Sequence, residues 1–130
     1  MNPNYEKERA EKIEFFRAQA EQYNFTREFN KAMEYYIRAG LLGDRDSIEE
    51  VCAKVRSGYG MSYNYDEFFR CMKAGADMGI TEAMIELAIC YGSGMGTEVD
   101  HEQVVYWLEK AAAAGSKEAK KKLEGKQTEK

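Results

Sequence analysis

Hydrophobic residues recur at helical spacing along the chain, and the pattern is clearest between Thr81 and Gly115. Two apolar faces with the i, i+4 spacing of a helix lie on either side of a glycine-rich segment. Glycine interrupts a helix readily because it loses much entropy on ordering and adopts positive φ. The stretch therefore predicts two short helices joined by a turn. Their apolar faces are Ala83, Leu87, Ala88 and Tyr91 in the first and Val104, Trp107, Leu108 and Ala111 in the second.

The same spacing predicts helices elsewhere in the chain. A charged helix from about residue 5 to 23 carries an apolar stripe of Ile13, Phe16 and Ala20, and a polar turn follows at about residues 24 to 27. Further helices are expected up to about Ala39, from about 46 to 57 and from about 65 to 78. The lysine-rich end fits a capping helix at 117–125, with a polar tail at 126–130.

These helices repeat with a period of 36 residues. Shifting the sequence by one period places Gly58 on Gly94 and Gly60 on Gly96, and it places Gly79 on Gly115. Repeats of this length indicate a solenoid, in which each helix pair packs mainly on its neighbours. We expect one repeat domain over residues 1–130, with units at about 9–43, 45–79 and 81–115.

Composition narrows the class of protein. The 130 residues have a net charge of −4, which argues against a dedicated nucleic-acid surface, and no apolar run approaches the roughly 20 residues that span a membrane. The charged N-terminal segment does not resemble a secretory signal, so a cytoplasmic protein is expected. The cysteines, Cys52, Cys71 and Cys90, lack the paired spacing of a zinc site or a disulfide framework and are expected to be free buried thiols.

The third unit carries a set of small, aromatic and glycine residues at fixed spacing: Ala83, Leu87, Ala88, Tyr91, Gly94, Gly96, Asp100, Trp107, Lys110, Ala111, Ala112 and Gly115. This pattern resembles the Sel-one-like repeat family, a branch of the tetratricopeptide-like α/α repeats. The middle unit matches this pattern weakly, and the first unit equally resembles an ordinary tetratricopeptide-like helix pair. The resemblance implies an all-α fold, a right-handed α/α solenoid of three helix-turn-helix repeats with a C-terminal capping helix.

Each matching residue has a structural explanation. Small residues let helices approach closely, glycines reverse the chain, and Asp100 can cap the second helix. No nucleophile is placed beside a base, and the single histidine, His101, lies in a turn next to Asp100. The glycines lack the lysine of a phosphate-binding loop. We therefore expect no enzyme, no cofactor and no metal.

With no catalytic group predicted, the function is expected to depend on surface residues that contact a partner. The resemblance implies that the first helix of each pair lines a concave side. Ile85 and Ile89 are apolar but lie off the face of Leu87 and Tyr91, so they either pack on the preceding pair or form an apolar spot for a partner. The turn containing Tyr59, Tyr63 and Tyr65 is a second candidate. The candidate partner-binding residues are Ile13, Arg17, Glu21, Glu49, Ala53, Arg56, Ile85 and Ile89 on the concave side and Tyr59 and Tyr63 in the turn.

The expected function is a non-catalytic module that binds another protein, with no nucleic-acid or membrane partner. The short chain, with no attached effector domain expected, suggests an inhibitor or immunity-type protein that acts by occupying its partner. One alternative is a regulatory or assembly subunit that self-associates through an exposed end of the stack. The other is a ligand sensor or enzyme. As an isolated chain, a monomer or weak dimer is expected.

Overall fold

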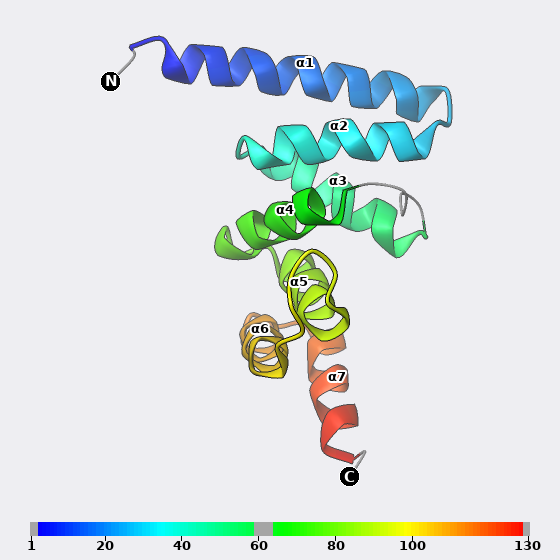
Figure 1. Ribbon diagram of the computed structural model, residues 1–130, viewed down its shortest axis with the longest axis vertical. Helices are drawn as coiled ribbons and strands as arrows, with labels where there is room; N and C mark the ends of the chain where they lie inside the picture. Colours follow the sequence, from blue (N-terminus) through cyan, green and yellow to red (C-terminus); the bar gives the residue numbers. More distant parts are fainter. Residues whose placement is uncertain (1–2, 59–63, 129–130) are drawn as a thin grey trace.

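The computed structural model describes residues 3–58 and 64–128. Within these residues the chain forms seven α-helices and no β-strand. Successive helices contact one another and descend as a stack from α1 at one end to α7 at the other, where α7 lies across α6 (Figure 1). The helices are α1 (Tyr5–Phe25), α2 (Phe29–Leu41), α3 (Arg45–Arg56), α4 (Tyr65–Asp77), α5 (Thr81–Ser93), α6 (His101–Ala113) and α7 (Lys117–Thr128).

The predicted period is visible in the backbone. Gly43, Gly79 and Gly115 stand one repeat apart, and each ends a helix pair at a positive φ of 99°, 88° and 105°. The left-handed conformation lets the chain turn directly into the next pair without the steric cost that other residues carry. The N-caps of α4 and α6 are also one repeat apart. Asn64 and Asp100 each accept hydrogen bonds from two backbone N–H groups of the helix that follows.

The core runs through the stack between the helices. Contacts join consecutive helices and also helices one repeat apart, α2 with α4 and α3 with α5. Small residues at matching positions of the second helices, Ala39, Gly75 and Ala111, are buried where these helices approach their neighbours. A Cβ atom on Gly75 would lie 2.7 Å from Ile48 Cγ2 and 2.8 Å from Ala83 Cβ. Close packing therefore excludes a larger side chain at this point.

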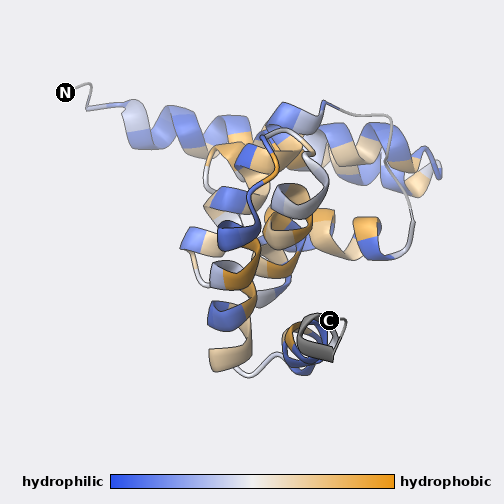
Figure 2. Cartoon of the chain, turned by 60° about the horizontal axis from the view of Figure 1, so that its bottom comes forward, coloured by the Kyte–Doolittle hydropathy of each residue, from blue (hydrophilic) through white to orange (hydrophobic). Residues whose placement is uncertain are grey.

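The two ends of the stack differ from its middle. In α5 seven residues are buried, whereas in the longer α1 only Ala20 is. The N-terminal half of α1 projects past α2 and is mainly hydrophilic (Figure 2). Asn4 is the N-cap residue of α1, but its side chain makes no capping hydrogen bond. At the other end, α7 continues to Thr128, beyond the expected boundary at residue 125.

Candidate interaction surface

The helices α1, α3, α5 and α7 lie along one side of the stack, which we call the first-helix face. Contacts between α3 and α5 join its middle, an ion pair joins Arg17 of α1 to Asp46 of α3, and Arg56 of α3 hydrogen-bonds to Glu118 of α7. The eight candidate residues that were expected on the concave side all belong to these helices. They are Ile13, Arg17, Glu21, Glu49, Ala53, Arg56, Ile85 and Ile89.

The N-terminal part of the first-helix face is polar. A hollow of about 300 Å³ between α1, α2 and α3 brings Arg17, Glu21 and Glu49 together. Arg17 Nε lies 3.7 Å from Asp44 Oδ2, and its Nη1 lies 3.8 Å from Asp46 Oδ2. Such part-exposed pairs contribute about 1 kcal/mol at most. A partner's carboxylate could therefore compete for Arg17 at low cost.

Another hollow, of about 440 Å³, lies along α1 and contains Ile13 beside Arg17 and Glu21. The side chain of Ile13 is half-buried. Hollows therefore cover the part of α1 that carries all three of its predicted contact residues.

A charged cluster lies at the centre of the first-helix face. Arg56 Nη2 donates a 2.6 Å hydrogen bond to Glu118 Oε1, which raises the pKa of Arg56. Between these helices Glu86 of α5 is 7% exposed, and burial raises the pKa of its carboxyl. Arg56 and Lys122 act against this rise, whereas Glu118 adds to it. The cluster ties α3 to α7 across α5.

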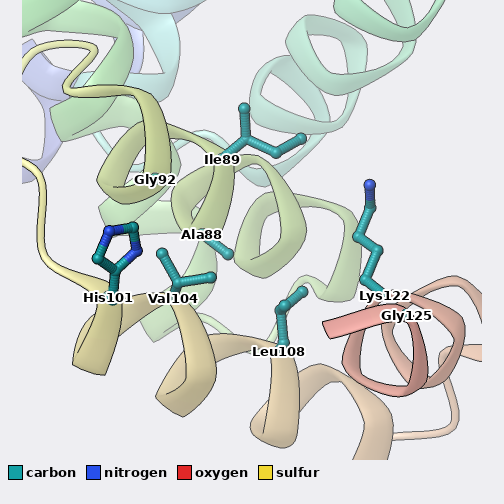
Figure 3. A pocket seen from close by; sticks show the side chains of 8 residues that line it. All are labelled: Ala88, Ile89, Gly92, His101, Val104, Leu108, Lys122 and Gly125. Carbon is teal, nitrogen blue, oxygen red and sulfur yellow. The ribbon is translucent and has the colours of Figure 1, made fainter. Parts of the chain in front are cut away.

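The C-terminal part of the first-helix face is apolar. A groove of about 440 Å³, here the C-terminal groove, opens between α5, α6 and α7 (Figure 3). Ile89, which is 39% exposed, lines it from α5, and Val104 and Leu108 line it from α6. Lys122 of α7 is the only lysine, arginine or carboxylate among its lining residues, which are Ala88, Ile89, Gly92, His101, Val104, Leu108, Lys122 and Gly125.

Some predicted contact residues do not fit this surface. Ile85 is only 2% exposed and belongs to the core, so its prediction as a surface contact is wrong; of its two interpretations, inward packing is the correct one. Ala53 is exposed on α3. Tyr59 and Tyr63 lie outside the described residues, and Tyr65, at the start of α4, is 44% exposed.

Sequence reasoning missed the contribution of α7. The sequence predicts only a capping helix at 117–125, whereas in the structure Glu118 and Lys122 of this helix approach Arg56 and Glu86. The 36-residue period could have predicted this position of α7, because Glu118 and Lys122 stand one period after Glu82 and Glu86 of α5. A helix in register with α5 belongs to the same face.

The remaining chemistry of the described part of the chain is limited. Cys52, Cys71 and Cys90 are free and buried, as expected, and burial raises the pKa of each thiol to about 12. No group of three or more histidine, cysteine, aspartate or glutamate residues among the described positions could hold a metal ion. A search of the described residues for a helix both long and apolar enough to cross a membrane finds none.

Stacked antiparallel helix pairs that repeat every 36 residues define this chain as an α/α solenoid. A family model described as Sel1 repeat matches residues 25–44 and 81–116. A crystal structure of a Sel1 repeat protein from Oxalobacter formigenes is similar, with a TM-score of 0.59 and 26% sequence identity. The match covers 75% of this chain and 28% of that one. A search of curated proteins gives no match.

These findings confirm the resemblance seen in the sequence. Residues 25–44 and 81–116 match Sel1 repeats, and together with the similar crystal structure they support a Sel1-like repeat family. The tetratricopeptide-like superfamily is consistent with the fold. Sel1 repeats generally serve as modules for protein–protein interaction, and proteins of this family are typically non-catalytic. The chain spans less than a third of the length of the Oxalobacter protein.

Proposed function

We propose that this chain is a non-catalytic module that binds a partner protein along its first-helix face. The observation that carries the proposal is the row of hollows on that face, which begins on α1 and ends at the C-terminal groove. The row changes from charged to apolar along its length. Such a surface offers separate sites for a partner's charged groups and for an apolar anchor, and buried anchors supply most of the binding energy in protein interfaces.

We propose further that the chain acts by occupying its partner, as an inhibitor or immunity-type protein does. Binding alone is sufficient for this role, so no catalytic group is needed. If the role is correct, the activity of the purified partner should fall in proportion to added chain and level off at equimolar amounts. An unchanged activity in the saturated complex would show that the chain binds without inhibiting.

The binding surface can be tested with exposed positions that contribute little to the core. Ala53→Arg changes the middle of the first-helix face, and Ile89→Glu changes its apolar end. Tyr106→Glu is the control, because Tyr106 is 48% exposed on α6, outside this face. Each variant is first checked for an unaltered helical circular dichroism spectrum and unfolding midpoint.

A partner recovered from the native cell with the wild-type chain should then be titrated against all three purified variants. We expect at least about a tenfold loss of affinity for Ala53→Arg and Ile89→Glu, because each places a charge in the contact. Tyr106→Glu should bind like the wild type. A loss seen only with Tyr106→Glu would assign binding to the opposite side of the stack.

A further inference from the structure

The residues of α6 that line the C-terminal groove have counterparts one repeat earlier, on α4, and there larger side chains fill the corresponding space. Val104 of α6 stands in register with Phe68 of α4, and Leu108 stands in register with Met72. Phe68 is 1% exposed and Met72 is fully buried, with its sulfur 3.8 Å from that of Cys52. Valine at position 104 therefore leaves open the space that a phenylalanine ring takes up in the preceding repeat. Valine has a smaller side chain than phenylalanine, so part of the space that the ring fills in the preceding repeat stays open here.

An unpartnered aromatic ring lies at the other end of the stack. Phe25, the last residue of α1, is 89% exposed, more than any other large hydrophobic residue described. It is exposed because α1 has no glycine near its end, so the helix runs on to Phe25 before the chain turns at Arg27. The turn between α1 and α2 and the helix α7 lie at opposite ends of the long axis (Figure 1).

The charges near the two features are also compatible. Glu28 follows Phe25 by three residues, and its side chain is 49% exposed. One carboxylate oxygen accepts a 2.9 Å hydrogen bond from Thr26 Oγ1, and the other lies 3.7 Å from Lys31 Nζ. At the groove, Lys122 lies on the side away from His101, and no carboxylate is among the lining residues (Figure 3). With the ring of another copy seated against Val104 and Leu108, the positive charge of Lys122 would attract the Glu28 carboxylate of the copy that supplies the ring.

We propose that Phe25 of one copy of this chain binds in the C-terminal groove of a second copy. The contact joins two different surfaces, so it leaves a free groove at one end of the pair and a free Phe25 at the other. Growth is therefore head to tail. This inference goes beyond the proposed function, although the two share Ile89, so self-association and partner binding would compete at that residue.

A single aromatic anchor in a small interface gives transient association. It should be measured by sedimentation equilibrium over protein concentrations from about 10 µM to about 1 mM. We expect the average mass of the wild type to rise above 14.9 kDa as concentration increases. A mass that stays at the monomer value over this range overturns the proposal.

Two variants remove one half of the contact each. Phe25→Ser deletes the anchor, and Val104→Phe fills the groove from within by restoring the residue of the preceding repeat. Both should remain monomeric at every concentration. Phe15→Ser is the control, because Phe15 is also exposed on α1, at 57%, and this variant should associate like the wild type. An equal loss with Phe15→Ser would overturn the assignment to Phe25.

Mixing the two blocked variants gives the sharpest result. Phe25→Ser keeps an open groove and Val104→Phe keeps a free Phe25, so an equimolar mixture should form dimers that cannot grow further. A mixture that remains monomeric while the wild type associates places the contact elsewhere. If circular dichroism shows that Val104→Phe does not fold, Ile89→Glu replaces it as the groove-blocking partner. The capture test with Ala53→Arg is independent of these results, because Ala53 does not line the groove.

Discussion

The first and third helix pairs occupy matching positions in the repeat but are stabilised differently. In the third pair, Trp107 is 5% exposed and most of α5 is buried beneath its neighbours. In the first pair, Tyr35 stands two repeats before Trp107 and is only half-buried, stacked on Tyr23 with 5.6 Å between ring centres. In the first pair α2 still buries large side chains such as Met33 and Tyr36, but α1, which has a neighbour on one side only, buries Ala20 alone.

The two pairs also turn differently. The third pair reverses through a loop in which Gly94 and Gly96 adopt positive φ, at 76° and 73°. The first pair has Gln22 and Asn24 at the matching positions, so α1 continues to Phe25 and the reversal falls on Arg27 at a φ of 64°. The family pattern is therefore strongest where the backbone requires glycine, and the first pair departs from it at a cost in strain.

The largest expected difference between the pairs is in the free energy of unfolding after aromatic truncation. Trp107→Ala should cost about 3 to 5 kcal/mol, because it empties a buried site. Tyr35→Ala should cost about 1 to 2 kcal/mol, since part of that ring is solvated in the folded state. Urea unfolding of both variants measures the difference, and equal losses would contradict it.

Trp107→Phe separates packing from hydrogen bonding at the buried site. The indole Nε1 of Trp107 is buried and has no hydrogen-bond partner among the described residues. Phenylalanine therefore gives up no hydrogen bond and should retain more stability than alanine. A loss as large as that of Trp107→Ala would indicate a polar contact to the indole.

Gly96→Ala tests the turn of the third pair and should cost about 2 to 3 kcal/mol. Alanine is strained at a φ of 73°, and its Cβ would lie 2.7 Å from Phe69 Cβ and also clash with the carbonyl of Tyr65. Gly115→Ala is the matched control, because Gly115 has a φ of 105° but no atom within 4 Å of the added Cβ. It should cost about 1 to 2 kcal/mol from conformation alone. Similar losses at the two positions would show that contact with α4 adds nothing.

Periodicity in the sequence predicts most of the architecture, but it predicts little that depends on the angles between helices. The helix order, the glycine turns and the burial of Trp107 all result from residue type at fixed spacing. The burial of Ile85 does not, because a residue beside the apolar stripe is covered or exposed according to how closely the next helix approaches. The contact of Arg56 with Glu118, 62 residues later, depends on how α3 and α7 lie around α5. Neither the burial of Ile85 nor the contact between Arg56 and Glu118 can be predicted from the sequence of one helix alone.

Arg27→Gly should stabilise the first pair by about 0.5 to 1 kcal/mol. Arg27 is the one non-glycine residue with positive φ in the described part of the chain, and glycine removes the steric strain while adding entropy to the unfolded state. Arg27→Ala is the control, because it removes the charge but keeps the Cβ. A gain of the same size in both variants would assign the effect to charge rather than to backbone strain.

The smallest expected effect concerns two carboxylates in matching positions, Glu14 on α1 and Glu86 on α5. Glu14 is exposed, whereas Glu86 is buried and its pKa is raised chiefly by burial. In the unfolded chain the Glu86 carboxyl returns to its ordinary pKa of about 4.3. As the pH rises from this value towards the higher pKa of the folded state, the Glu86 carboxyl loses its proton in the unfolded chain first. Ionisation of Glu86 therefore lowers the stability of the fold.

Glu86→Gln is neutral at every pH and should therefore be more stable than the wild type at pH 7. The advantage should disappear at about pH 3 to 4, where the wild-type carboxyl is protonated in both states. Glu14→Gln should change the stability little at either pH, because its side chain is solvated. Urea unfolding midpoints across this range measure both variants. If Glu86→Gln is instead less stable than the wild type at pH 7, the attraction of Glu86 to Arg56 and Lys122 exceeds the cost of its burial. The carboxylate would then stabilise the first-helix face in its ionised form.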